Sequence, residues 1–424
     1  MKTQRVLTIL GVARTRVAIN WRTGLQLIGF LNAALMLPAT AQKASFQSLG
    51  QMPGVWPAAG TYASAISGDG STIMGYGWVC ADGGTTCSSS SSVKAYRWTV
   101  TSGYQILTPI AGSDFFGAGA VSYDGSVIVG ENPQFNQFAA FRWTTAGGLT
   151  TLPMNIAQAI TADGSMVAGA GMWWKTSGQT GTFGAFPGQP NQTEAFGLAG
   201  TAAAPEAVGA AINGADAFGP TFNAFWWTSD TGLHDIGVPG VGSDADAISA
   251  DTFVIVGEHQ VSGFWRAFRW TASTGMVDIG TLGGPESRAV ATNKDGSVVV
   301  GTSLTTSSSA SNHAFRWTTK TGMQDLQTLL KGTKASQWAV LFIANGVSAD
   351  GTVISGYGLS PKTAQFPFGQ WTPFRAVLPV PSRVVRHQEA NSYGRIHFRI
   401  SSKHKHTRVT WENRGDFSRA SSRS

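Results

Sequence analysis

The stretch that begins RAVATNKDGSVVVG alternates short apolar runs with tight polar turns. Its Asp295-Gly296 pair suits a hairpin turn, because Asp and Gly both accept the positive φ angles that such turns require. The run SVVVG that follows is apolar throughout, as expected of a strand covered on both faces. Further on, the alternation in AFRWT places Phe315 and Trp317 on one face of a strand and Arg316 on the other. TKTG then turns the chain into MQDLQTL, so the pattern predicts a four-stranded antiparallel meander with MQDLQTL as its fourth strand.

Versions of this unit recur along almost the whole chain. The Asp of the Asp-Gly pair recurs at Asp69, Asp124, Asp163, Asp295 and Asp350, with Asp251-Thr252 as a variant. The aromatic strand recurs at Arg97-Trp98, Arg142-Trp143, Trp173-Trp174, Trp226-Trp227, Arg269-Trp270 and Arg316-Trp317, with Gln370-Trp371 as a degenerate copy. The unit around residues 200–237 has lost the Asp-Gly pair and kept the aromatic strand. Seven units of roughly 40 to 55 residues result.

Repeats of this size, with four strands and a fixed aromatic, are typical of β-propeller blades. One meander cannot bury both of its faces, so neighbouring units must cover it. The stretch FQSLGQMPG at 46–54 resembles the fourth strand and exit of a unit, although it precedes the first unit. We therefore predict an all-β protein, a seven-bladed β-propeller in which this N-terminal strand completes the last blade. An open β-solenoid of the same units is the alternative.

The recurring Asp-Gly pairs are more simply explained as hairpins than as a row of binding sites. Ca²⁺ sites are the alternative, but one carboxylate per turn falls far short of the about six to eight oxygens that Ca²⁺ takes. For the Arg of the aromatic strand two roles are open. It stacks on an aromatic ring of the neighbouring blade, or it lies solvated on a blade face.

The first 41 residues differ from the repeats and carry basic residues with no acidic one. The basic residues are Lys2, Arg5, Arg14, Arg16 and Arg22. A basic leader, the apolar run GLQLIGFLNAALMLPATA and its final A-x-A site together indicate a secretory signal peptide, cleaved after Ala41. A membrane anchor is the alternative, which Pro38 and the shortness of the run disfavour, and no later stretch approaches the about 18 apolar residues of a spanning helix. We expect an exported protein, extracellular, at the cell surface or in the periplasm, without a transmembrane segment after cleavage.

The last segment, residues 383–424, is basic, rich in Ser and poor in apolar residues, so we expect it to be disordered. With the leader it accounts for the formal net charge of +7, because residues 42–382 carry 15 basic and 20 acidic residues. We therefore expect no nucleic-acid partner for the repeat domain, 42–382. The tail's KHKH run could hold a metal weakly, although a solvated tail is the simpler interpretation. The abrupt change in composition also fits a shifted reading frame or a truncation.

The chain has two cysteines, Cys80 and Cys87, in the Gly-rich segment CADGGTTC. In an oxidising compartment we expect them to form a small local disulfide. Two free thiols are the alternative. A metal site is disfavoured because no His or third Cys lies nearby.

The phrases AFRWT…TGM.DIGTLGG and A..IS.DGS.IVG resemble those of the HAF-repeat proteins, an extracellular bacterial repeat family. The clearest matches are 267–284 and 314–326, and the similarity covers about residues 46–379. The resemblance implies an exported protein, since members are exported and some carry an autotransporter barrel or a sorting signal at the C-terminus. It implies no activity and no catalytic residue. After Pro379 this chain departs from the family, because the tail has no alternating barrel pattern.

Few residues of the repeats have the spacing of a catalytic or metal site. Before the tail the histidines are His234, His259 and His313, and none has a metal-ligand spacing. Asp244 and Asp246 would share one face of a strand, but a polar blade edge is the simpler interpretation. We therefore predict no catalytic residue, no metal and no cofactor, in an exported binding or adhesion scaffold or an autotransporter-like passenger. The alternative is a secreted propeller enzyme, a polysaccharide hydrolase or lyase.

Binding residues are expected on the loops between the second and third strands and between units, because these vary in length and content while the tight turns do not. Their aromatic residues are of a kind enriched at contact surfaces, namely Trp78, Phe135, Trp265 and Phe366. The alternative is that each merely covers the end of a blade. The partner expected at this rim is a glycan or another surface protein.

We predict that the exported chain begins at Gln42 and that its mass rises by about two hydrogens on reduction, from opening of a Cys80–Cys87 disulfide. N-terminal sequencing and mass spectrometry before and after reduction measure both. A cytosolic chain that keeps its leader would contradict the first expectation, and an unchanged mass the second.

Overall fold

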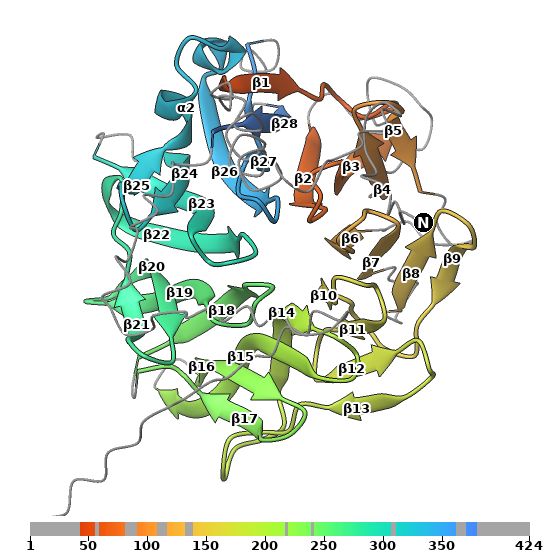
Figure 1. Ribbon diagram of the computed structural model, residues 1–424, viewed down its shortest axis with the longest axis vertical. Helices are drawn as coiled ribbons and strands as arrows, with labels where there is room; N and C mark the ends of the chain where they lie inside the picture. Colours follow the sequence, from red (N-terminus) through yellow and green to blue (C-terminus); the bar gives the residue numbers. More distant parts are fainter. Residues whose placement is uncertain are drawn as a thin grey trace, which may run out of the picture. The chain divides into compact units, whose positions relative to one another are not determined.

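The computed structural model describes residues 43–379, except 56–58, 81–90, 108–116, 132–138, 217–218, 239–240, 307–310 and 362–369. Its strands form seven four-stranded antiparallel sheets, arranged in a ring as the blades of a propeller (Figure 1). The predicted fold class is confirmed, including the number of blades and the number of strands in each. The expected signal peptide and tail lie outside the described residues.

The strands of the first four blades follow one another in chain order from the centre outwards. Blade 1 contains β2 (Thr61–Ile66), β3 (Thr72–Cys80), β4 (Ser91–Thr99) and β5 (Gly103–Ile106). Blade 2 contains β6 (Gly117–Val121), β7 (Val127–Glu131), β8 (Ala140–Thr144) and β9 (Gly148–Thr151). Blade 3 contains β10 (Ala159–Ile160), β11 (Met166–Ala168), β12 (Met172–Lys175) and β13 (Thr180–Thr182). Blade 4 contains β14 (Thr193–Gly200), β15 (Pro205–Asp216), β16 (Gly219–Thr228) and β17 (Gly232–Asp235).

Blades 5 and 6 repeat this order, and blade 7 takes its outer strand from the other end of the chain. Blade 5 contains β18 (Ser243–Ile248), β19 (Ile255–Val261), β20 (Phe264–Thr271) and β21 (Gly275–Asp278). Blade 6 contains β22 (Gly283–Thr292), β23 (Val298–Thr305), β24 (Asn312–Thr318) and β25 (Gly322–Asp325). Blade 7 contains β26 (Val340–Val347), β27 (Val353–Leu359), β28 (Trp371–Val377) and β1 (Ser45–Ser48).

The N-terminal strand β1 closes the ring. It pairs antiparallel with β28, with Phe46 opposite Ala376, and the Leu49 N–H extends the pairing by donating to the Pro373 carbonyl at 3.0 Å. The ring of Phe46 packs against Phe374, with ring centroids 5.6 Å apart. The predicted closure is confirmed, and the open solenoid is excluded because the first and last strands lie side by side in one sheet.

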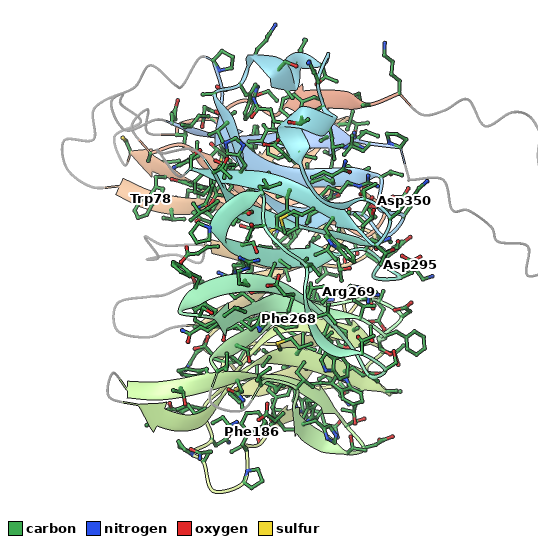
Figure 2. All side chains as sticks on the ribbon, turned by 90° about the vertical axis from the view of Figure 1, so that its left-hand side faces the viewer. Trp78, Phe186, Phe268, Arg269, Asp295 and Asp350 are labelled. Carbon is green, nitrogen blue, oxygen red and sulfur yellow. The ribbon has the colours of Figure 1, made fainter. Side chains whose placement is uncertain are left out.

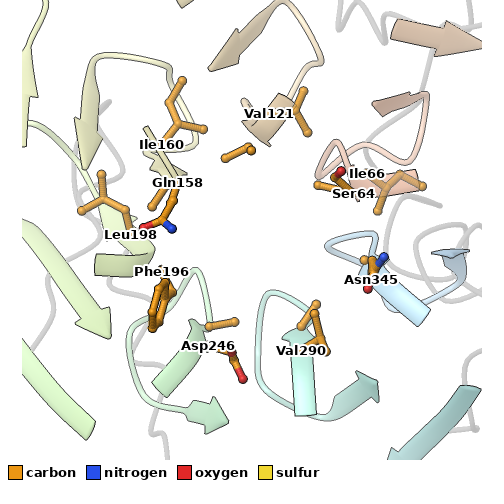
Figure 3. Close-up of a pocket in the computed structure, with 18 of the residues that line it drawn as sticks. Ser64, Ile66, Val121, Gln158, Ile160, Phe196, Leu198, Asp246, Val290 and Asn345 are labelled. Atoms are coloured by element: carbon orange, nitrogen blue, oxygen red, sulfur yellow. The ribbon is translucent and has the colours of Figure 1, made fainter. Parts of the chain in front are cut away.

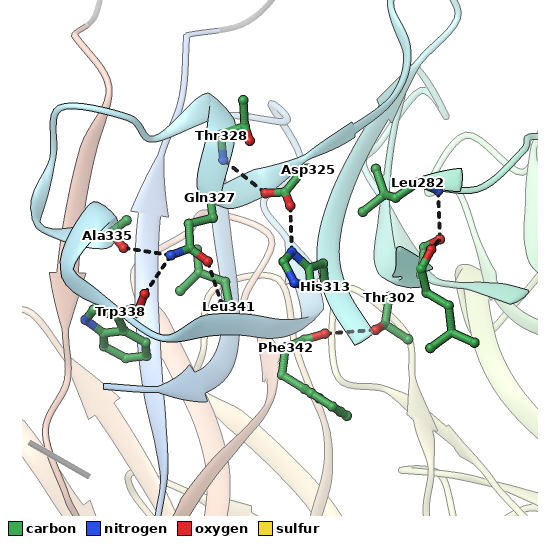
Figure 4. Close-up of polar contacts among 12 residues, drawn as sticks. Leu282, Thr302, His313, Asp325, Gln327, Thr328, Ala335, Trp338, Leu341 and Phe342 are labelled. Atoms are coloured by element: carbon green, nitrogen blue, oxygen red, sulfur yellow. Dashed lines mark hydrogen bonds and ion pairs between the residues drawn. The ribbon is translucent and has the colours of Figure 1, made fainter. Parts of the chain in front are cut away.

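A short insertion after β25 braces this closure. MQDLQTL is a strand only as far as Asp325, so the predicted fourth strand of blade 6 was too long. The Asp325 carboxylate accepts a hydrogen bond from the Thr328 N–H at 3.0 Å and thereby caps α2 (Leu326–Leu329), which leads into the 3₁₀ helix η1 (Lys334–Gln337) (Figure 4). The insertion ends at Trp338, whose ring meets Phe46 edge-on at 5.1 Å between centroids.

The aromatic strand of each blade supplies the core between blades. Its first aromatic residue is less than 2% exposed in six blades, as Tyr96, Phe141, Phe225, Phe268, Phe315 and Phe374. The burial of the Trp two residues later varies, since Trp98, Trp143 and Trp227 are buried, whereas Trp270 and Trp317 are half-buried. Phe315 of blade 6 packs in one cluster with Val256 and Ala267 of blade 5. The first aromatic residue therefore fills the space between adjacent sheets, and in three blades the Trp belongs to the same core.

The Asp-Gly pairs form the hairpins predicted for them. At the first, the Gly70 N–H donates to the Ser67 carbonyl at 2.9 Å, and Gly70 has a φ of +73°. The Asp69 carboxylate accepts hydrogen bonds from the Ser67 hydroxyl at 2.5 Å and the Ser71 N–H at 2.9 Å. Burial acts to raise the pKa of Asp69, but these hydrogen bonds outweigh it and hold the pKa below its usual value. Each such carboxylate is thus used by its own turn.

These turns also join neighbouring blades. Backbone hydrogen bonds run from turn to turn, as Asp251 N–H to Lys294 O, Lys294 N–H to Ala349 O, Ala349 N–H to Gly68 O, Asp69 N–H to Tyr123 O, and Tyr123 N–H to Ala162 O. They link blades 5, 6, 7, 1, 2 and 3 in order, and the series omits blade 4, the blade that lost its Asp-Gly pair. A Cβ on Gly125 of blade 2 would overlap Thr72 of blade 1, so the turn glycine also permits close blade packing.

The Arg of the aromatic strand has a role that the sequence did not suggest. Arg97 Nε donates to the carbonyl of Gly125, the turn glycine of the next blade, at 3.2 Å. Arg269 Nε donates in the same way to Gly296, also at 3.2 Å, and lies toward the side of the ring that carries Asp295 (Figure 2). Neither expected role, stacking or solvation, describes these two side chains. At these two positions the arginine instead satisfies a carbonyl at the blade junction, whereas the Nε atoms of Arg142, Arg316 and Arg375 have no hydrogen-bond partner among the described residues.

Within the part of the chain that the structure describes, no helix has the length and apolar content to span a bilayer.

We predict that Phe315→Ala lowers the free energy of unfolding by about 3–5 kcal/mol, because it leaves a cavity between blades 5 and 6. Trp317→Ala should cost less, since that side chain is half-buried. Chemical denaturation measures both, with Val277→Ala, at a position 46% exposed, as the control. A larger loss for Trp317→Ala than for Phe315→Ala would contradict the packing described.

Candidate functional site

The seven innermost strands surround a central cavity of about 390 Å³. Three consecutive residues of each blade line it, and they form three tiers (Figure 3). The innermost strands end in the Asp-Gly turns, which define the turn rim. The opposite rim, here the loop rim, carries the connections between second and third strands and between blades. The first residue of each triplet therefore lies nearest the loop rim.

The tiers differ in chemistry. The middle tier is made only of small residues, Ala65, Ala120, Ala159, Gly197, Ala247, Ala291 and Gly346. The tier toward the turn rim is mainly branched aliphatic, with Ile66, Val121, Ile160, Leu198, Ile248, Thr292 and Val347. The tier toward the loop rim, here called the bulge ring, has a different residue in every blade, Ser64, Gly119, Gln158, Phe196, Asp246, Val290 and Asn345. All of these residues except Gly119 are labelled in the close-up of the channel (Figure 3).

A β-bulge and a glycine create this ring. In six inner strands the register shifts across the bulge-ring residue, as between Ala245 and Ala247. The adjacent second strand has a glycine where the inner strand comes closest, and a Cβ on Gly257 would overlap the Asp244 carbonyl oxygen. The same overlap occurs at Gly75, Gly130, Gly169, Gly209, Gly301 and Gly356. The glycine that ends SVVVG and its equivalents is therefore what lets the bulge form.

A group of charged side chains lies at the bulge ring between blades 5 and 6. Arg288 Nη2 donates to Asp246 Oδ1 at 2.6 Å and its Nε to Asp246 Oδ2 at 3.1 Å. Arg288 Nε also lies 3.6 Å from Glu258 Oε1, and Glu258 pairs across the sheet with Asp244. Three carboxylates thus lie near one guanidinium, and two of them contact it, so negative charge is in excess.

Burial shifts the protonation of these carboxylates. It raises the pKa of Glu258 to about 7, with a smaller contribution from the charge of Asp246 and against the effect of Arg288. It raises the pKa of Asp244 to about 6, again with repulsion from Asp246. Asp244 and Asp246 were expected on a polar blade edge. That interpretation was wrong, because the side chain of Asp246 is 8% exposed and holds an arginine of the next blade.

Aromatic side chains gather where the ring closes between blades 7 and 1. Tyr62 stacks on Tyr76 with centroids 5.1 Å apart and meets Tyr357 edge-on at 5.2 Å. Trp371 meets Tyr357 at 5.5 Å. All four are half-buried, and burial raises the pKa of Tyr62 and of Tyr357 to about 12. Tyr62 lies two residues before Ser64, so this cluster adjoins the bulge ring.

The residues singled out from the sequence for binding are only partly described. Trp78 on β3 and Trp265 on β20 are half-buried, and Trp78 lies at the rim opposite Asp295 and Asp350 (Figure 2). Trp265 faces Gly242, so it partly covers a blade end. Phe135, Phe366 and Cys87 lie outside the described residues, and the disulfide to the buried Cys80 stays a prediction. None of the described candidates lines the channel.

The three histidines of the repeats lie apart from one another. His234 packs on Trp226 at 5.3 Å between ring centroids. His259 meets Phe268 edge-on at 6.0 Å, and His313 Nδ1 lies 2.6 Å from Asp325 Oδ2 (Figure 4). Among the described residues, no group of three or more His, Cys, Asp or Glu is placed to hold a metal ion.

The bulge ring was missed from the sequence, although a signal for it exists. In the phrase Ala-x-Ala that precedes the Asp-Gly turn, both flanking positions stay small while the middle one changes from unit to unit. This contrast indicates that packing within the blade does not restrict which side chain occupies the middle position.

No protein-family model matches the chain, and no curated protein sequence does either. Several solved structures resemble it in fold. An oligogalacturonate lyase in complex with manganese has a TM-score of 0.48 at 12% identity, over 80% of this chain and 97% of that one. A putative TolB from Agrobacterium tumefaciens has a TM-score of 0.40 at 13% identity, over 80% of this chain and 99% of that one. The β-propeller domain of the Trilobed protease from Pyrococcus furiosus has a TM-score of 0.48 at 10% identity, over 74% of this chain and 95% of that one. At these values the likeness carries no argument about function.

We predict that Glu258→Gln raises the melting temperature at about pH 8 and leaves it unchanged at about pH 4. A carboxyl whose pKa is raised on folding contributes stability below its unfolded pKa, and this contribution is lost as pH rises through the folded value. For Asp244 and Glu258 the loss extends from about pH 4 through the folded pKa values of about 6 and about 7. Glutamine cannot ionise, so the Glu258→Gln variant avoids the share of this stability loss that is due to Glu258.

Thermal melts across this pH range measure the effect. Asp230→Asn, at an exposed turn position, is the control and should show no pH-dependent difference from the wild type. A melting temperature of Glu258→Gln below that of the wild type at pH 8 would show that the ionised Glu258–Arg288 pair is stabilising instead.

Proposed function

We propose that this chain is an exported, non-catalytic binding scaffold, related to the HAF-repeat proteins that it resembles, and that it presents its loop rim and the channel mouth to a partner. The partner is a glycan or another surface protein. A scaffold of this kind acts at the cell surface, as a secreted protein or as an autotransporter-like passenger.

The observation that carries this proposal is the contrast between framework and bulge ring. The turn aspartates, the turn glycines, the second-strand glycines and the buried Phe or Tyr repeat from blade to blade. The bulge ring carries seven different side chains on the same backbone. Variable side chains on a rigid and repeated backbone are the usual arrangement of a recognition surface.

The loop rim supports the same proposal. Its connections vary in length, whereas the turn rim is held by hydrogen bonds between successive turns. Half-buried aromatic side chains lie on this side of the blades at Trp78 and Trp265, and such residues are enriched where proteins contact partners.

A secreted enzyme acting on a polysaccharide is the second candidate function, and one observation favours it. Glu258 and Asp244 lie beside the channel with pKa values raised to about 7 and about 6. Carboxyl groups poised near neutral pH can act as general acids or bases. Under this alternative the mature protein would shorten a bound oligosaccharide, and Glu258→Gln would abolish the cleavage.

We predict that the mature protein binds a glycan on an array, or a surface protein in a pull-down, and that Trp78→Ala and Trp265→Ala weaken this binding at least about tenfold. Phe253→Ala is the matched control, because Phe253 lies in the variant Asp251-Thr252 turn at the turn rim and is 72% exposed. It should leave binding unchanged.

Two results would overturn the proposal. The first is binding that survives both tryptophan substitutions and is lost in Phe253→Ala, which would place the partner on the turn rim. The second is the absence of any partner in both assays.

A further inference from the structure

The channel has room for a small molecule, and the polar side chains of its lining are almost confined to the bulge ring. Its volume of about 390 Å³ lies within the range of small-molecule sites, about 300–1,000 Å³. The small middle tier offers no side-chain polar group, and the tier toward the turn rim offers one, Thr292. A ligand that enters from the loop rim therefore meets its main polar contacts at the bulge ring.

These polar groups are spread around the channel. Blades 1, 3, 5 and 7 contribute Ser64, Gln158, Asp246 and Asn345, and the blades between them contribute Gly119, Phe196 and Val290 (Figure 3). Polar and apolar positions thus alternate round the ring, apart from the junction of blades 7 and 1. A ligand that satisfies all four must carry polar groups in several directions and an apolar surface between them.

One of these groups lacks a partner within the protein. Gln158 Oε1 is shielded from solvent and has no hydrogen-bond partner among the described residues. A buried acceptor without a donor destabilises the fold. Rotation of the Gln158 side chain toward the channel would expose this oxygen to a donor on a bound ligand.

The other groups of the ring are also acceptors. Asn345 Nδ2 is held by the Ala63 carbonyl at 2.7 Å, which leaves its Oδ1 for a ligand. The Asp246 carboxylate is bound by Arg288 and can still accept a further hydrogen bond. The ring therefore offers acceptors to the donors of a ligand, besides the donors of Ser64 and Gln158, while the excess carboxylates beside Arg288 disfavour an anion.

We propose that the channel binds the ring of one neutral sugar residue, with its hydroxyl groups donating to Gln158, Asp246 and Asn345 and its apolar C–H face against Phe196. The inference rests on the proposed binding function and names the ligand class at the channel mouth. A sugar ring combines hydroxyl donors in several directions with an apolar face, whereas an alkylammonium group concentrates its donors at one point.

Calorimetric titration of the full chain tests this assignment. The probes are the methyl glycosides of glucose, galactose, mannose and N-acetylglucosamine, with galacturonate and putrescine as charged comparisons. At least one neutral glycoside should bind with a Kd from about micromolar to millimolar, and galacturonate should bind at least about tenfold more weakly.

Gln158→Met is the decisive variant. It keeps the length of the side chain and removes the unpartnered acceptor, so its melting temperature should equal or exceed that of the wild type. Its affinity for the glycoside should fall about tenfold, whereas Phe253→Ala at the turn rim should leave affinity unchanged.

Several outcomes would overturn the assignment. They are binding of no neutral glycoside, stronger binding of galacturonate or putrescine, or unchanged affinity in Gln158→Met. If the chain binds an array glycan or a surface protein through its loop rim but binds none of the free glycosides, the proposed function stands and the sugar site in the channel is refuted. A chain that binds nothing in either experiment would lose both.

Discussion

Each sheet of this protein is apolar on both faces, so it is stable only when another sheet covers each side. In six of the seven blades the buried Phe or Tyr of the third strand meets this constraint, as Phe315 does against Val256 and Ala267. A row of such sheets would leave two uncovered faces at its ends, and a ring leaves none. The pairing of β1 with β28 closes that ring, and the contacts of Phe46 with Phe374 and Trp338 hold the strand in place.

The closed ring in turn determines which kinds of residue can line the central channel. Seven inner strands that converge on one axis leave little room, and the middle tier of the channel accordingly holds only Ala and Gly. The second-strand glycines let six of the inner strands bulge, and the bulge places one residue of the strand at the channel. The framework determines where that side chain lies and leaves its chemistry free. A position of this kind can acquire a binding role without loss of packing.

The carboxylates at the two ends of the channel have pKa values shifted in opposite directions. At the turn rim each Asp is satisfied by the hydroxyl and N–H groups of its own turn, and at Asp69 this lowers the pKa. At the bulge ring the carboxylates are buried with one guanidinium among three, and the pKa values rise. The first group therefore contributes stability above its unfolded pKa, whereas the second reduces stability as the pH rises toward neutrality.

The sequence by itself determined the all-β class, the seven blades, the hairpins and the closing strand, because each depends on local turn chemistry and on a hydrophobic pattern that repeats. The strand predicted from MQDLQTL was too long, because Asp325 caps α2 and the chain leaves the sheet at that residue. Only the tertiary structure decided which residues meet at the centre. Gln158, Asp246 and Asn345 lie far apart in the chain, and no local pattern relates them until the ring closes. The role of Arg97 and Arg269 was hidden for the same reason, because their acceptors belong to the next blade.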